Sequence, residues 1–200
     1  ADFGSGAVSN TGTLTINGTL ESELSLSNTG TATIAGPDSV IKGDITNSGT
    51  FNFRSNAEVT GVVNNSGTLN VDAGASGMVF ATLLNAASGT VQLNAQATLN
   101  NVTNSGSLTV NTTASTTVIG ALDNKSGAKL IASGAVVFGL GGGEGGVENA
   151  GTITISNSVS CIDGAELVNY AGGYLYLNQT LPLDDHSSTL NISNAGTIEI

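Results

Sequence analysis

The 200-residue chain holds 4 basic and 15 acidic residues, which gives a formal net charge of -11 at pH 7, although only 10% of its residues are charged. This balance disfavours phosphate backbones and anionic lipid headgroups, so we expect neither nucleic acid nor a membrane surface as a partner. The single cysteine excludes an internal disulfide.

A sequence motif, Asn-x-Gly-Thr followed by apolar-x-apolar, recurs along the whole chain. The first copy is Asn10-Thr-Gly-Thr-Leu-Thr-Ile16. Further full copies begin at Asn28, Asn47, Asn65, Asn104, Asn149 and Asn194, and shorter copies surround Gly89, Gly127 and Gly173. Consecutive motif glycines lie 17 to 24 residues apart. A period of this size indicates a solenoid, in which each repeat buries its apolar side against its neighbours.

Each repeat is expected to hold two or three short strands. In the first repeat Leu14 and Ile16 alternate with Thr13 and Thr15, so the two pairs face opposite sides of a strand. A second apolar segment precedes most of the following Asn-x-Gly corners, as in Leu24-Ser-Leu26. Long runs with the three-to-four spacing of a helix are absent from the sequence.

These features predict an all-β fold, a parallel β-helix (β-solenoid) of about ten coils of 17–24 residues wound from one chain. Asn and Gly suit the corners because both tolerate left-handed backbone angles. Since the corners stack above one another, their asparagine side chains are expected to form an amide ladder.

Residues 1–200 are predicted to be one β-helix segment of a longer rod. Coils over 1–106 are regular, whereas the longer coils over 107–200 carry loop insertions, among them the glycine-rich stretch 139–146 and the polar stretch 181–188. In solenoids such insertions gather on one side and often carry the binding function.

The candidate contact residues lie in these later loops: Asp163, Glu166, Asp184, Asp185 and His186. Two carboxylates and an imidazole are ligands that a cation accepts, but sequence neighbours rarely converge on one ion. We therefore expect a solvated loop and no metal site. Residues 141–146 match G-x-G-x-x-G, yet no helix follows to hold a pyrophosphate, so no cofactor is expected either.

Two alternative functions depend on the outward surface of the rod. A polysaccharide hydrolase or lyase would gather carboxylates on one face, but here they are scattered and no catalytic residue is predicted, so we do not expect an enzyme. An ice-binding β-solenoid would use a flat Thr-x-Thr array. That array is interrupted at one of its two positions by Asn52, Asn70, Gln92 and Glu199, and β-propensity on a half-exposed strand explains the threonines.

The Asn-Ser-Gly-Thr-Leu-x-Val repeats, which cover nearly all of the chain, resemble the passenger domains of self-associating, AIDA-type bacterial autotransporter adhesins. The resemblance implies a right-handed β-helix on the outside of a bacterial cell, held at the outer membrane by a C-terminal barrel outside these residues. It also implies a virulence-associated adhesin that drives aggregation, biofilm formation or host-cell attachment. The implied partners are copies of itself on neighbouring cells or a host surface receptor, with O-linked glycans on Ser and Thr.

Overall fold

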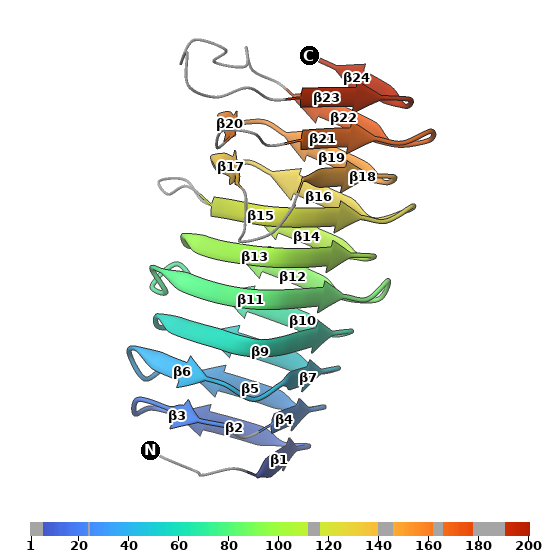
Figure 1. Ribbon diagram of the computed structural model, residues 1–200. Helices are drawn as coiled ribbons and strands as arrows, with labels where there is room; N and C mark the ends of the chain where they lie inside the picture. Colours follow the sequence, from blue (N-terminus) through green and yellow to red (C-terminus); the bar gives the residue numbers. More distant parts are fainter. Residues whose placement is uncertain (1–5, 24, 112–116, 140–145, 162–165, 178–190) are drawn as a thin grey trace.

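The computed structural model describes residues 6–23, 25–111, 117–139, 146–161, 166–177 and 191–200. These residues form a right-handed parallel β-solenoid with no helix. The coils stack into a rod whose first and last strands lie at opposite ends (Figure 1). The predicted fold class is therefore confirmed.

Two parallel sheets run the length of the rod. The first sheet has 14 strands. Ten of them form its continuous path: β1 (Ala7–Asn10), β4 (Ser25–Asn28), β7 (Ile45–Asn47), β9 (Ala57–Asn65), β11 (Met78–Asn85), β13 (Ala97–Asn104), β15 (Thr117–Asn124), β18 (Val147–Asn149), β21 (Glu166–Asn169) and β23 (Asn191–Asn194). The other four are β3 (Glu21–Ser22), β6 (Ser39–Ile41), β17 (Val136–Phe138) and β20 (Val159–Cys161). The second sheet has ten strands: β2 (Thr13–Ile16), β5 (Thr31–Ile34), β8 (Thr50–Phe53), β10 (Thr68–Val71), β12 (Thr90–Leu93), β14 (Ser107–Val110), β16 (Lys129–Ala132), β19 (Thr152–Ile155), β22 (Tyr174–Leu177) and β24 (Thr197–Glu199).

The first sheet bends, so each complete coil has three sides. The long strand β9 shows this, because its first residues pair with β6 and its last residues pair with β7. Strands on this third side occur in β3, β6, β17, β20 and the first halves of β9, β11, β13 and β15. The described residues thus make about 8 complete turns, slightly fewer than the ten coils predicted.

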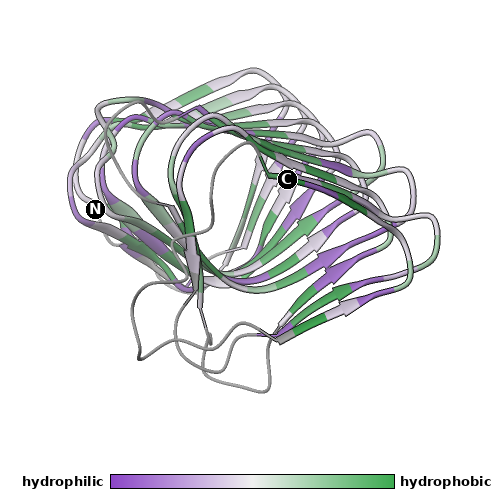
Figure 2. Cartoon of the chain, turned by 90° about the horizontal axis from the view of Figure 1, so that it is seen from above, coloured by the Kyte–Doolittle hydropathy of each residue, from purple (hydrophilic) through white to green (hydrophobic). Residues whose placement is uncertain are grey.

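The core is a set of apolar columns parallel to the rod axis. Strand registers place apolar residues directly above one another, and they are buried at alternate positions, as in β8 and β10. Matching bands of hydrophobic and hydrophilic residues are visible from coil to coil (Figure 2). Where aromatic residues meet, Phe53 packs against Phe51 and Phe80 at ring-centroid distances of 4.9 and 5.5 Å. Burial of such side chains is the main stabilising contribution, at roughly 1.5–3 kcal/mol for each large one.

A buried asparagine ladder joins the corners between the two sheets. The Nδ2 of Asn65 donates to Asn85 Oδ1 at 2.9 Å, while Asn65 Oδ1 accepts from Asn47 Nδ2 at 2.8 Å. The same Nδ2 also reaches the carbonyl oxygens of Gly67 (3.1 Å) and Thr90 (3.2 Å). Equivalent amide contacts connect Asn10, Asn28, Asn47, Asn65, Asn85, Asn104, Asn124, Asn149, Asn169 and Asn194. The predicted amide ladder is confirmed, and it satisfies polar groups that would otherwise be buried unpaired.

Three ladder residues, Asn85, Asn124 and Asn169, were not part of the predicted set. Their corners hold extra residues before the next strand, so the Asn-x-Gly spacing is lost. The sequence pattern that could have identified these asparagines is the apolar-x-Asn ending of the strand before the corner, as in Leu83-Leu-Asn85 and Leu167-Val-Asn169.

Candidate binding face

The outward side of the second sheet presents two columns of side chains, which we call the threonine face. Its inward positions are buried core residues, so the alternate positions must point away from the core. The first column is Thr13, Thr31, Thr50, Thr68, Thr90, Ser107, Lys129, Thr152, Tyr174 and Thr197. The second column is Thr15, Thr33, Asn52, Asn70, Gln92, Thr109, Ile131, Thr154, Tyr176 and Glu199.

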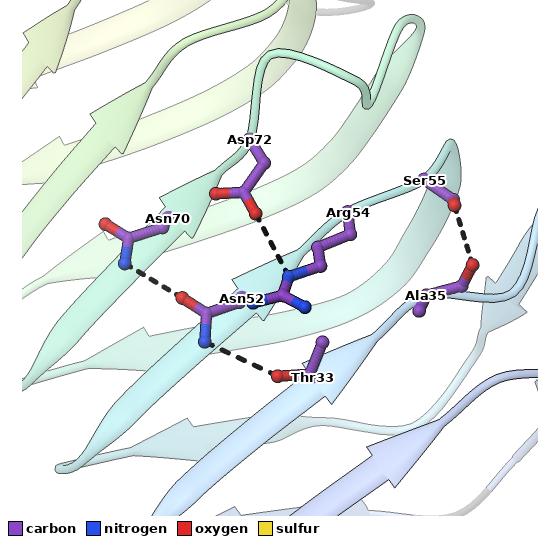
Figure 3. Close-up of polar contacts among 7 residues, drawn as sticks. All are labelled: Thr33, Ala35, Asn52, Arg54, Ser55, Asn70 and Asp72. Atoms are coloured by element: carbon purple, nitrogen blue, oxygen red, sulfur yellow. Dashed lines mark hydrogen bonds and ion pairs between the residues drawn. The ribbon is translucent and has the colours of Figure 1, made fainter.

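Three consecutive side chains of the second column, Thr33, Asn52 and Asn70, bond to one another along the rod axis (Figure 3). Asn70 Nδ2 donates to Asn52 Oδ1 at 2.9 Å, and Asn52 Nδ2 reaches Thr33 Oγ1 at 3.5 Å. Beside this row, Arg54 Nε lies 3.3 Å from Asp72 Oδ2, and Ser55 donates to the carbonyl of Ala35 at 2.7 Å. The Arg54–Asp72 pair is largely exposed, and such surface pairs contribute only about 0–1 kcal/mol. These contacts order the face without adding net charge to it.

Charge is distributed unevenly around the rod. On the threonine face the only charged positions among the described residues are Lys129 and Glu199. On the bent first sheet, five strands carry acidic side chains at outward positions: Glu21, Glu58, Asp123, Glu148 and Glu166. Because the whole chain carries a net charge of -11, the threonine face is a nearly neutral strip on an acidic rod.

A shallow groove of about 270 Å³ runs beside the asparagine corners on the first sheet. Its lining is uncharged: Thr46, Asn64, Asn65, Ser66, Leu84, Asn85, Ala86, Thr103 and Ser105. Leu84 is its large exposed apolar residue, with 38% of its surface accessible. This groove is a second neutral surface, separate from the threonine face.

Two tyrosines occupy the C-terminal part of the threonine face. Tyr174 and Tyr176 are half-buried, while Leu175 and Leu177 of the same strand point inward and are buried. The Tyr174 hydroxyl donates to Glu199 Oε2 at 2.6 Å. This hydrogen bond is the largest cause that raises the pKa of Tyr174 above its ordinary value of 10.0.

The Tyr174–Glu199 bond predicts a specific alkaline titration. The raised pKa means that the folded state favours the neutral phenol, so the bond's stabilisation is present below about pH 10 and is lost as the pH rises through the raised pKa. In the Glu199→Gln variant we expect the pKa of Tyr174 to fall towards 10.0, which ultraviolet absorbance of the phenolate measures. Tyr170 serves as the internal control, because its pKa is raised chiefly by the negative charge of Glu148. An unchanged titration of Tyr174 in Glu199→Gln would contradict the assignment.

Of the predicted contact residues, only Glu166 is described. It begins β21, is exposed, and lies beside Asn191 of β23 in the strand register. Asp163, Asp184, Asp185 and His186 lie outside the described residues, as do residues 140–145 of the glycine-rich stretch. The face residues that the sequence interpretation did not select are Ile131, Tyr174 and Tyr176. The sequence pattern that could have identified them is the presence of a larger, less polar residue at repeat positions where other coils have threonine.

Two further observations apply to the described part of the chain. It contains no cluster of three or more His, Cys, Asp or Glu side chains arranged to hold a metal ion. It also contains no helix with both the length and the hydrophobicity needed to cross a bilayer.

Comparisons of the chain with protein-family models, with curated proteins and with solved structures found no match.

Proposed function

We propose that this chain is a non-catalytic adhesin segment displayed on the outside of a bacterial cell. In this role its rod promotes cell–cell aggregation and biofilm formation or attaches cells to a host surface. The observation that carries the proposal is the nearly neutral threonine face, which repeats the same hydroxyl and amide groups along the rod. Such groups are less costly to desolvate than ions, and many weak contacts sum when two long surfaces meet.

The uneven charge distribution favours the threonine face as the contact between two copies. Two rods of net charge -11 repel each other. Contact through the threonine face keeps the acidic first-sheet side chains of both rods away from the interface. Salt would then strengthen association, because it screens the repulsion between the rods.

Displaying the intact protein on non-aggregating bacteria and following cell settling tests the proposal. We expect clumping, faster at 0.3 M than at 0.05 M NaCl. The variant Thr31→Glu/Gln92→Glu, which places two carboxylates on the threonine face, should abolish clumping. The matched control Ser27→Glu/Asn64→Asp adds the same charge to exposed positions of the first sheet and should clump nearly as well as the parent.

The outcomes separate the alternatives. Loss of clumping in the control alone would move the contact to the first sheet. If parent and both variants clump alike, the contact between copies lies outside both mutated surfaces. If the parent does not clump but attaches to host cells, self-association is wrong and a host receptor is the partner. Absence of both clumping and attachment would overturn the adhesive function.

Ice binding is a second candidate, favoured by one observation. Thr13, Thr31, Thr50, Thr68 and Thr90 stand in one unbroken column, and parallel strands repeat at roughly 4.8 Å. The neighbouring column holds Asn52, Asn70 and Gln92, which breaks a two-column lattice, so we rank this function second. Thermal hysteresis of the purified protein is the deciding measurement, and release of reducing sugars from polysaccharides tests the enzymatic alternative.

A further inference from the structure

The C-terminal part of the threonine face differs chemically from the rest of it. Strand registers place Ile131, Thr154 and Tyr176 in one row across β16, β19 and β22. Lys129, Thr152 and Tyr174 form the adjacent row. We call these six residues the tyrosine patch. Ile131 has 42% of its surface exposed, which makes it one of the most exposed large apolar side chains described.

We infer that the tyrosine patch binds an uncharged polysaccharide chain. This inference rests on the proposed adhesive function, since it names one partner for the same face. Sugar rings have an apolar C–H side and a rim of hydroxyl groups. The tyrosine rings and Ile131 offer apolar surface to the C–H side of a sugar ring. The hydroxyls of Thr152 and Thr154 offer hydrogen bonds to its hydroxyl groups.

The patch is rigid before any ligand arrives. Its three strands are hydrogen-bonded in register, with Leu130, Ile153 and Leu175 buried directly beneath the outward positions. The Tyr174 hydroxyl is held by Glu199. Because a tyrosine has few rotatable bonds and this one is already fixed, little conformational entropy is lost on binding.

Charge and size select the class of ligand. Lys129 is the single basic residue of the patch, whereas the chain as a whole is strongly acidic. Uronate-containing or sulfated chains would therefore be repelled. Two strand spacings, roughly 10 Å, separate Ile131 from Tyr176, which is the length of a short oligosaccharide. The side chains of Ile131, Tyr174 and Tyr176 supply much less contact area than the 1,200 Å² or more that stable protein interfaces usually bury, so the patch by itself suits a small ligand better than a protein.

Affinity electrophoresis of the intact protein tests the inference directly. The gels contain soluble neutral polysaccharides (mannan, xylan or mixed-linkage β-glucan) or the anionic probes heparin and polygalacturonate. Depletion by insoluble cellulose and chitin extends the neutral set. We expect binding to at least one neutral polysaccharide and to neither anionic probe. The Tyr174→Ala/Tyr176→Ala variant should bind at least tenfold more weakly.

Two controls distinguish loss of the patch from other effects. Tyr174→Phe/Tyr176→Phe keeps both rings and should retain most of the binding, and Leu84→Ser, which removes an exposed apolar residue from the other neutral surface, should leave it unchanged. Circular dichroism checks that each variant is folded. Failure of the parent to bind any neutral polysaccharide, or full binding by the folded double alanine variant, would overturn the inference.

The settling assay keeps this inference separable from the proposed function. If the double alanine variant loses clumping while the parent binds no polysaccharide, the patch is a contact between copies of this chain, and the polysaccharide inference fails although adhesion stands. If the parent binds polysaccharide but displaying cells neither clump nor attach, the inference holds and the adhesive function fails.

Discussion

Replacing Asn65 by alanine should lower the free energy of unfolding by about 2–4 kcal/mol. The side chain is 1% exposed, and its Nδ2 donates to Asn85 Oδ1 and to two main-chain carbonyls. Its loss leaves Asn85 Oδ1 buried without that donor and opens a gap in the corner. An unsatisfied buried polar group alone costs about 1–3 kcal/mol.

The adjacent residue provides the matched control. Asn64 lies on the same strand but points outward and is exposed, so Asn64→Ala should change stability by no more than about 0.5 kcal/mol. Urea unfolding followed by circular dichroism measures both variants. Hydrogen exchange shows where along the rod the structure is weakened, because stacked repeats open locally. We expect lost protection at the amides of Gly67 and Thr90. Equal effects of the two substitutions would refute a stabilising role for the ladder.

Asn65→Asp is the sharper variant because it keeps the shape of the side chain. A carboxylate oxygen would replace Nδ2 and face three oxygen acceptors, so the loss should exceed that of Asn65→Ala at neutral pH. Acidification should recover part of it, since a protonated carboxyl group donates one hydrogen bond. If Asn65→Asp were as stable as the parent at pH 7, the direction of the amide ladder would be wrong.

Gly67→Ala is expected to destabilise the rod by about 3 kcal/mol or more. A Cβ at this position would lie 2.2 Å from the carbonyl oxygen of Gly49 and 2.6 Å from the carbonyl carbon of Ser48. Both obstacles are main chain of the coil below, and the oxygen of Gly49 already accepts a hydrogen bond from Thr68 N at 2.8 Å, so relief requires the coils to separate. Overpacking of this kind usually costs about 1–3 kcal/mol, and rigid surroundings raise the cost.

Gly74→Ala is the corresponding control. An added Cβ there would meet only Arg54 O at 3.4 Å, an ordinary contact. We expect it to be neutral or to stabilise by up to about 1 kcal/mol, because alanine restricts the unfolded chain. Thermal and urea unfolding of the pair check the prediction. Comparable stability of the two variants would show that close approach of coils is not what requires glycine at the corner.

The sequence predicted the fold because its signal is repeated. One copy of Asn10-Thr-Gly-Thr-Leu-Thr-Ile16 is a weak strand-and-corner signal, but the recurrence of the copies at a narrow spacing leaves few other architectures. The alternation of Leu14 and Ile16 with threonines also predicted which positions point outward. The number of complete turns was less predictable, because the third side is a separate short strand in some coils, such as β3, and the first half of a long bent strand in others, such as β9.

The candidate faces depended on information that the repeat pattern does not carry. Asn85 and Asn169 join the ladder although extra corner residues disrupt their motifs, because the strand before each corner sets the register. Tyr174 and Ile131 are 43 residues apart in the chain, and only the stacking of β16, β19 and β22 places them on one patch. The acidic residues likewise looked scattered along the chain until the strand registers placed five of them, Glu21, Glu58, Asp123, Glu148 and Glu166, on the two parts of the bent first sheet.

For this protein, the sequence by itself determined a β-solenoid with asparagine corners, a surface of mostly uncharged polar residues and a net negative charge. It could do so because the repeat pattern involves residues close together in the chain. Apart from the stacked asparagine corners, which the repeat predicted, tertiary structure alone decided which residues from different coils become neighbours. Each coil advances the chain by one strand spacing, so small changes in corner length shift distant side chains into or out of a shared column. The asparagine ladder, the neutral threonine face and the tyrosine patch are all products of that stacking.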